Sequence, residues 1–345
     1  MSLTHTLGIA LPILQAPMAG VQGSALAIAV ARAGGLGALP CAMLAPSAMA
    51  EALTAFRAAT DAPVNVNFFC HAPPAPDASA QARWQAALAP YYAEFGLDIG
   101  AVPAGPGRRP FDGAACDAIA PFRPEVVSFH FGLPEAALLE RVKAWGARVL
   151  ASATTVEEAE WLAAHGADAI IVQGLEAGGH RGMFLAEELT TQVGTFALLP
   201  QVREAVDLPL IAAGGIADAR GVAAARALGA EAVQVGTAFL CCPESNTSAI
   251  HRRALMSDAA RHTALTNLYS GRPARGIVTR LMSELGPMSD AAPAFPLATA
   301  AVAPLRAAAE AQGSGDFSPL WAGQNASRCR AVPAAEVVAE LAEGL

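Results

Sequence analysis

The 345-residue chain has few charged side chains, and basic residues are the scarcer kind. Charged residues make up 15% of the sequence, and 22 Lys and Arg face 30 Asp and Glu, for a formal net charge of −8. Nucleic-acid binding requires clustered basic side chains that neutralise phosphates, and the sequence contains no such block. We therefore expect no nucleic-acid partner.

Long apolar runs are also missing, although 54% of the residues are hydrophobic. Gly, Pro, Asp or Arg interrupts each apolar stretch well before the ~20 residues that a membrane-spanning helix needs. The segment 1–18 has no Lys or Arg and contains Pro12 and Pro17, which argues against a signal peptide. The sequence therefore predicts a cytoplasmic protein without a membrane partner.

Paired cysteine motifs are absent as well. Six cysteines are spread along the chain without a CxxC pair, so neither zinc spacing nor a disulfide framework is present. Cys241 and Cys242 end an apolar run, where free thiols pack as small hydrophobic groups. We predict no metal site.

The abundance of apolar residues excludes disorder for most of the chain, and the length favours one large domain with an appendage. Short β-branched runs alternate with Ala-rich amphipathic segments. The predicted strands are 12–16, 36–40, 63–68, 125–129, 147–151, 168–172, 208–212 and 231–235. The predicted helices between them include 24–33, 46–59, 77–95, 134–145, 155–165 and 217–228.

The strands read as continuous apolar runs, as parallel strands buried on both faces do. Gly146, Gly166 and Gly229 stand at predicted helix ends just before strands. Eight successive βα units favour an α/β fold of the TIM (β/α)8 type over an open, doubly wound sheet, which stays the competing interpretation.

The pattern changes after residue 240, where helical stretches at 247–260, 298–312 and 334–344 follow without strong strand signals. We predict a barrel core at 1–241 and a helical lid or insertion near the active site at 242–297. A mainly helical extension at 298–345 would hold the barrel-closing helix, 298–312, and a C-terminal tail.

Glycine-rich turns follow the last two predicted strands, where α/β barrels often hold a phosphate. Gly214 and Gly215 let backbone N–H groups approach an anion, and Asp218 is placed to cap the next helix. Gly236 and Thr237 supply a second set of donors. One such turn is common in any α/β protein, but two in successive units favour a phosphate site.

Ordered motifs run along most of the chain: LPILQAPMAGV, VNVNFF, VSFHFGLP, GLEAGGHRG, AAGGIAD, QVGTAF, SGRPARG and LWAGQ. In these motifs the sequence resembles the class I nitronate monooxygenases, formerly called 2-nitropropane dioxygenases, which are FMN-dependent TIM-barrel enzymes. The resemblance implies FMN as cofactor. Together with the glycine turns, it gives the expected cofactor-binding residues: Ala16, Pro17, Met18, Asn67, Gln173, Gly178, Gly179, Gly214, Gly215, Gln234, Val235, Gly236 and Thr237.

His180 is the candidate catalytic residue, because it lies among glycines after the sixth predicted strand and histidine titrates near neutrality. The resemblance implies that it deprotonates a neutral nitroalkane or orients the nitronate. His130 and His71 are candidates for the substrate pocket. We expect structural roles for the other histidines, which are His5, His165, His251 and His262.

Two charged residues near these motifs have open roles. Glu176 either orients His180 or acts as a solvated or helix-capping carboxylate. Arg275 either reaches an anionic group or lies exposed at the surface.

The resemblance implies oxidation of alkyl nitronates, propionate 3-nitronate in particular, by FMN and O2 to an aldehyde or keto product plus nitrite. An alternative is an NAD(P)H-dependent flavin quinone reductase or enoyl-thioester reductase on the same scaffold, although no Rossmann module is found. A non-catalytic flavin- or phosphate-binding sensor is a third interpretation. The oligomeric state stays open.

Overall fold

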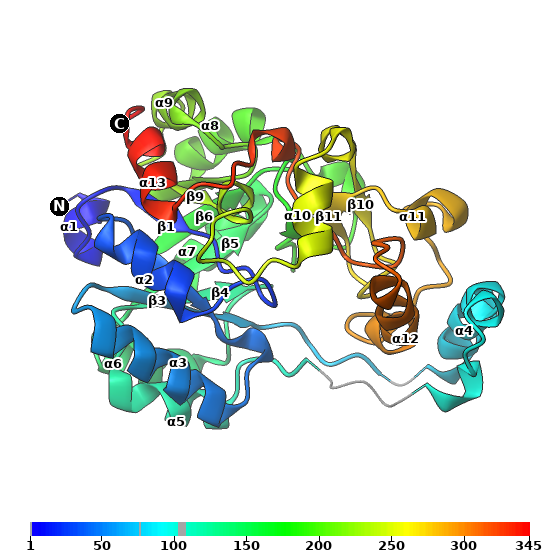
Figure 1. Ribbon diagram of the computed structural model, residues 1–345. Coiled ribbons are helices and arrows are strands. Elements are labelled where there is room, and N and C mark those ends of the chain that lie inside the picture. Colours follow the sequence, from blue (N-terminus) through cyan, green and yellow to red (C-terminus); the bar gives the residue numbers. More distant parts are fainter. Residues whose placement is uncertain (1, 76, 103–107) are drawn as a thin grey trace.

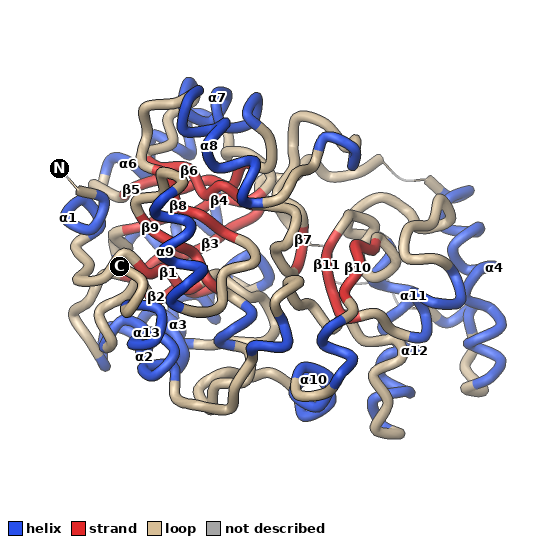
Figure 2. The backbone as a smooth tube through the Cα atoms, turned by 90° about the horizontal axis from the view of Figure 1, so that it is seen from above, coloured by secondary structure: helices blue, strands red, loops and turns tan. Residues whose placement is uncertain are grey.

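The computed structural model describes residues 2–75, 77–102 and 108–345, and its main feature is an eight-stranded parallel barrel (Figures 1 and 2). The strands are β1 (Ile13–Gln15), β2 (Gly37–Pro40), β3 (Val64–Phe69), β4 (Val126–His130), β5 (Arg148–Ala153), β6 (Ala169–Gln173), β8 (Leu210–Ala213) and β9 (Ala232–Val235). Their order is β1-β9-β8-β6-β5-β4-β3-β2, and a parallel bridge between Leu14 and Leu36 closes the ring. The TIM-barrel prediction and all eight predicted strands are confirmed, with ends that agree within two residues.

Helices surround the barrel. They are α2 (Ser24–Arg32), α3 (Pro46–Ala59), α5 (Gly113–Ile119), α6 (Ala136–Ala144), α7 (Val156–Ala164), α8 (Thr195–Ala205), α9 (Ala219–Ala227) and α13 (Ala334–Ala342). The turns into β5, β6 and β9 contain Gly146, Gly166 and Gly229 at φ between 91° and 103°, a left-handed conformation that favours glycine. The short α1 (Leu3–Leu7) buries Leu3 and Leu7 with barrel residues such as Leu14.

A smaller part lies beside the barrel, on the right of Figure 1. It contains the antiparallel sheet β10-β11-β7, formed by β10 (Thr263–Thr266), β11 (Ala274–Ile277) and β7 (Gly179–His180). Its helices are α4 (Ala78–Glu94), α10 (Ala249–Leu255), α11 (Arg280–Leu285) and α12 (Ala298–Ala311). The strands β10 and β11 lie after residue 240, where the sequence gives no strong strand signal.

The helix α4 is present where the sequence predicts one, but it does not belong to the barrel ring. Trp84 and Leu88 pack in one core with Leu305 of α12, and the Trp84 indole donates a hydrogen bond to the Ala298 carbonyl at 3.1 Å. The helix α5 stands in the ring instead, between α3 and α6. The aromatic face of α4 packs against residues from the C-terminal third of the chain.

The prediction that 298–312 closes the barrel is also wrong. The helix α12 occupies that segment and packs on α4, whereas α13 packs between α2 and α9. Val337, Val338 and Leu341 of α13 lie in the same core as Val30 of α2 and Val222 of α9. These contacts make α13 the helix that closes the ring.

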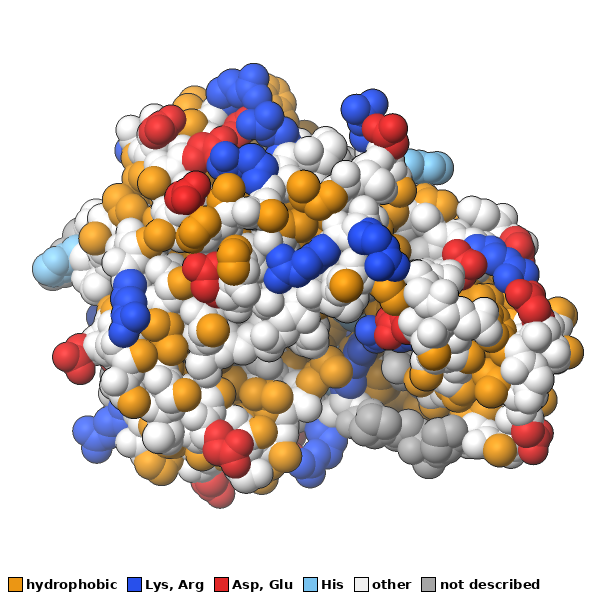
Figure 3. All heavy atoms as spheres, in the orientation of Figure 1, with side chains coloured by type: hydrophobic (Ala, Val, Ile, Leu, Met, Phe, Trp, Pro, Cys, Tyr) orange, Lys and Arg blue, Asp and Glu red, His pale blue; other side chains and the backbone are white. Residues whose placement is uncertain are grey.

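The surface offers few extended features. In the part of the chain that the structure describes, no helix is both long enough and apolar enough to cross a membrane. On the face drawn in Figure 3, basic and acidic side chains are interspersed, and no patch of one sign dominates.

If α13 completes the barrel, Leu341→Ala should lower the free energy of unfolding by about 2–5 kcal/mol, because Leu341 is 0% exposed. Leu345→Ala is the matched control. Leu345 is 39% exposed, so its truncation should change the free energy by no more than about 0.5 kcal/mol. Urea unfolding measures both, and equal effects would contradict the assignment of α13.

Candidate active site

One cavity opens where the carboxyl ends of the barrel strands meet the smaller part. It encloses about 1430 Å³ including its mouth. Residues from the ends of β1, β3, β4, β6, β8 and β9 line it, as in other α/β barrels. The lining includes most of the predicted residues: Ala16, Pro17, Met18, Asn67, His130, Gln173, Gly178, Gly179, His180, Gly214, Gly215, Gln234, Gly236 and Thr237.

Two predicted site residues do not line the cavity. Val235 is 1% exposed and packs in the core between strands and helices, because neighbours in a strand point to opposite faces and Gln234 faces the cavity. His71 lies behind the cavity wall, where its Nε2 is 3.0 Å from the Arg108 carbonyl oxygen.

The two glycine turns form a cradle at one end of the cavity. Gly214 and Gly215 have φ of 112° and 76°, which a residue with a Cβ adopts only with strain. Asp218 caps α9 by accepting a hydrogen bond from the Gly221 N–H at 3.1 Å. A Cβ on Gly236 would lie 3.2 Å from the Ala16 Cβ, so the β1 loop packs closely on this turn.

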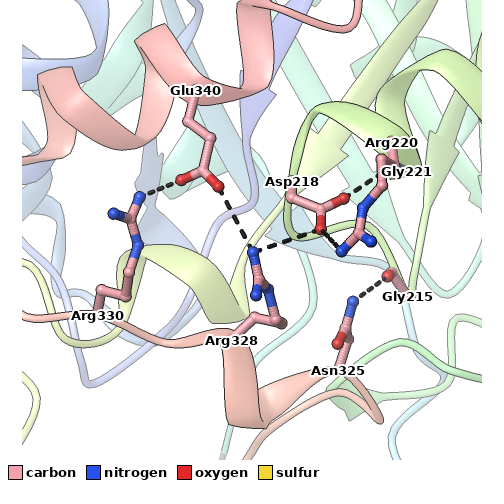
Figure 4. Close-up of polar contacts among 8 residues, drawn as sticks. All are labelled: Gly215, Asp218, Arg220, Gly221, Asn325, Arg328, Arg330 and Glu340. Carbon is pink, nitrogen blue, oxygen red and sulfur yellow. Dashed lines mark hydrogen bonds and ion pairs between the residues drawn. The ribbon is translucent and has the colours of Figure 1, made fainter.

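The C-terminal segment holds this cradle in place (Figure 4). The Asn325 amide donates to the Gly215 carbonyl at 3.1 Å. Arg328 bridges Asp218 at 3.5 Å and Glu340 of α13 at 3.7 Å, and Arg330 also pairs with Glu340. The sequence motif LWAGQ ends just before Asn325, but nothing in the pattern signals these contacts.

His180 also lines the cavity and lies on β7. Its Nε2 is 2.8 Å from the Ser270 hydroxyl, and its backbone pairs with Ala274 of β11. Its carbonyl accepts hydrogen bonds from the Gln173 amide at 3.0 Å and from His130 Nε2 at 3.1 Å. Because a carbonyl only accepts, His130 carries a proton on Nε2, and its Nδ1 accepts from Ser152 at 3.0 Å.

Both histidines are neutral at neutral pH. Burial lowers the pKa of His180 well below the usual value of 6.5, and the positive charge of Arg108 lowers it further. Burial also lowers the pKa of His130 to about 4. A neutral imidazole in this position can accept a proton from a substrate or donate one hydrogen bond to it.

Aromatic rings form a chamber beside His180. Phe131 packs on Phe69 and Phe295, with ring centroids 5.1 and 5.5 Å apart, and the Phe295 ring lies 5.4 Å from His180. The Trp321 ring lies 5.6 Å from His180 on another side. These rings make the surroundings of His180 apolar, which is the physical cause of its lowered pKa.

Contacts decide the role of Glu176, and they give Arg275 neither of its two expected roles. Both carboxylate oxygens of Glu176 accept from the Thr195 N–H at the start of α8, and Oε2 lies at 2.8 Å. Glu176 is therefore a helix-capping carboxylate and does not contact His180. Arg275 is buried, and its Nε donates to the Leu175 carbonyl at 3.0 Å. Both side chains hold backbone around the site.

Sequence reasoning missed several lining residues, among them Phe69, Arg108, Ser152, His251, Trp321 and Asn325. His251 was expected to be structural on its helix. It is 4% exposed, lines the cavity, and its Nε2 has no hydrogen-bond partner among the described residues. Its place in a helix gave no signal, because α10 reaches the cavity only through the tertiary fold.

Comparison with known proteins places the chain in a family. A family model described as nitronate monooxygenase matches residues 1–344. The chain belongs to the nitronate monooxygenase family. It is therefore an oxidoreductase, as the resemblance predicted.

Relatives and solved structures agree with this assignment. A protein named nitronate monooxygenase from Paraburkholderia phytofirmans is 44% identical over 99% of this chain and 93% of its own length. Another protein of that name, from Pseudomonas aeruginosa, is 43% identical over 99% of this chain and 98% of its own length. A solved structure of nitroalkane oxidase from Streptomyces ansochromogenes superposes with a TM-score of 0.90 at 40% identity, covering 100% of this chain and 99% of that one. The sequence identity and the structural similarity thus extend over nearly the whole chain.

The buried neutral His251 predicts acid sensitivity. Burial lowers its pKa to about 4, whereas histidine in an unfolded chain titrates near ~6.5. Between these values the unfolded state binds more protons, so stability falls as the pH drops below about 6.5. His251→Asn should shrink the loss of unfolding free energy between pH 7 and pH 5 by about 1–2 kcal/mol, measured by urea unfolding.

The control is His262→Asn, since His262 is exposed. It should leave the difference between the two pH values unchanged. A His251→Asn protein with the full wild-type pH dependence would contradict the assignment.

Proposed function

We propose that the protein binds FMN and uses O2 to oxidise alkyl nitronates, propionate 3-nitronate among them, to an aldehyde or keto product and nitrite. The observation that carries the proposal is one continuous cavity that joins a glycine cradle to an apolar chamber containing neutral His180. The lining residues that the structure describes include no Asp or Glu, so the cavity suits an anionic cofactor and an anionic substrate.

The residues present fit FMN. Gly214, Gly215, Gly236 and Thr237 leave backbone N–H groups accessible for a phosphate, at the starts of α9 and of the turn Thr237–Phe239. The buried Gln234 Oε1 lines the cavity and has no hydrogen-bond partner among the described residues, so it offers an acceptor to a polar ligand. When bound there, FMN would supply the electron acceptor for substrate oxidation and the route to O2.

The chain itself would position the substrate and move a proton. His180, neutral and held through Ser270, would take the proton from the carbon of a neutral nitroalkane or donate a hydrogen bond to a preformed nitronate. The rings of Phe69, Phe131 and Phe295 would exclude water from this contact.

An NAD(P)H-dependent flavin reductase is the alternative, because related scaffolds exist. FabK from Thermotoga maritima superposes with a TM-score of 0.73 at 27% identity. An enoyl reductase domain of MlnA from Bacillus amyloliquefaciens is 16% identical at a TM-score of 0.52, which shows a shared fold alone. The higher identity and TM-score of the nitroalkane oxidase structure favour nitronate oxidation.

The first test uses the visible spectrum of the purified protein. It should show the absorption of oxidised flavin, which propionate 3-nitronate should bleach rapidly under anaerobic conditions, whereas NADH should bleach it slowly. Rapid reduction by NADH with an inert nitronate would support the reductase instead. A protein that neither carries nor binds FMN would contradict the whole proposal.

The second test replaces the proposed proton acceptor. His180→Asn should retain FMN, because His180 is not one of the residues that form the phosphate cradle. It should lower kcat/KM for a neutral nitroalkane by about 100-fold or more, since general-base catalysis contributes 10²–10⁴-fold, but affect a preformed nitronate far less. Steady-state oxygen consumption measures both rates.

The matched control is His165→Asn, at the exposed end of α7. It should leave both rates unchanged. If His180→Asn also left both rates unchanged, His180 would have no part in the reaction.

A further inference from the structure

We propose that Arg108 binds a second anionic group of the substrate, such as a carboxylate, and thereby selects nitronates that carry one. The proposal rests on the proposed nitronate oxidation and names the substrate class of the same cavity. Arg108 is the cationic side chain among the described lining residues, and those residues include no Asp or Glu to neutralise it.

The Arg108 side chain is half-buried, and its guanidinium is incompletely bonded. Its NH1 nitrogen is shielded from solvent and has no hydrogen-bond partner within the described ranges. Leaving a buried donor without an acceptor is unfavourable, so an acceptor that a ligand brings would be bound strongly. The planar guanidinium matches a carboxylate, which accepts two parallel hydrogen bonds.

The position of Arg108 separates this contact from the reacting end of the substrate. The guanidinium carbon lies 5.3 Å from the Phe295 ring centroid, and the same ring lies 5.4 Å from the ring of His180. A short substrate in the cavity, which both side chains line, can therefore meet His180 with its nitronate and Arg108 with its second anionic group. The positive charge of Arg108 also reaches His180, whose pKa it lowers.

Arg272 carries another guanidinium near the chamber, and its Nε also has no hydrogen-bond partner among the described residues. Arg272 stacks on Phe131, with its guanidinium carbon 4.3 Å from the ring centroid, and its NH2 donates to the Met183 carbonyl. Arg272 does not line the cavity. Arg108 is therefore the residue placed to meet a ligand.

His71 is a positioning residue for Arg108. Its Nε2 lies 3.0 Å from the Arg108 carbonyl oxygen, so this nitrogen carries a proton and donates. The Phe295 ring packs edge-on against the His71 ring at 4.8 Å. The histidine thus fixes the backbone from which the guanidinium projects. This gives His71, which does not line the cavity, a role in the proposed site.

The test compares two nitronates that differ only in the second anion. Propionate 3-nitronate carries a carboxylate where propyl 1-nitronate carries a methyl group. Arg108→Gln should lower kcat/KM for propionate 3-nitronate by roughly 10- to 100-fold. The loss should come mainly through KM, because the lost hydrogen bond to the carboxylate is equally strong in the ground state and in the transition state. For propyl 1-nitronate the change should stay within about threefold, and Arg108→Lys should recover part of the loss.

The comparison isolates the contact from other effects of the substitution. Any change in the pKa of His180 acts on both nitronates and cancels in the ratio of their kcat/KM values. Arg109→Gln is the matched control, because the Arg109 side chain is 72% exposed and lies outside the cavity lining. His71→Phe should raise KM for propionate 3-nitronate with little change in kcat, whereas His71→Gln, which can still donate to the carbonyl, should restore it.

A binding measurement separates this inference from the proposed function. Calorimetry with the holoenzyme should show tighter binding of 3-nitropropionate than of 1-nitropropane, and Arg108→Gln should abolish the difference. Equal losses for both nitronates, or a difference that survives in Arg108→Gln, would overturn the assignment of Arg108. If the wild-type protein oxidises neither nitronate, the proposed function fails, while calorimetry still decides whether Arg108 binds the carboxylate.

Discussion

The backbone carbonyl of His180 is the point on which the site depends, because two barrel strands hold it. Gln173 at the end of β6 and His130 at the end of β4 both donate to this oxygen. The Gln173 Oε1 also accepts from the Gly182 N–H at 2.7 Å, so one amide fixes the loop on both sides of Arg181. The strand β7 is thereby fixed above the barrel, and its pairing with β11 carries the small sheet with it.

This arrangement explains how polar side chains at barrel strand ends serve structure and chemistry together. A buried carbonyl needs donors, and neutral His130 and Gln173 supply them without adding charge next to His180. The chamber stays apolar, which keeps His180 neutral. The cavity thus contains a cradle of backbone donors and a proton-accepting chamber, and Arg108 in its wall supplies a positive charge.

The barrel could be predicted from the sequence because each βα unit is encoded locally. Apolar runs of three to six residues mark the strands, glycines precede β5, β6 and β9, and the turns after β8 and β9 mark the cradle. The pairing of α4 with α12 could not be predicted, since residues more than 200 positions apart supply its two faces, as in the hydrogen bond from Trp84 to Ala298. The two-residue β7 exists only through its tertiary partners. The atoms of Arg108 and His251 that have no partner among the described residues arise only when the chain is folded.

The position of α13 has a consequence for biosynthesis. The first βα unit of the barrel, β1 and α2, is completed by α13, whose Leu341 lies in the core with Ile13 and Leu26. A ribosome releases residues in order, so the apolar face of α2 stays uncovered until α13 has been made. Until then this apolar face is open to chaperones and to misfolding contacts. The first helix made in the barrel ring is thus among the last to be covered.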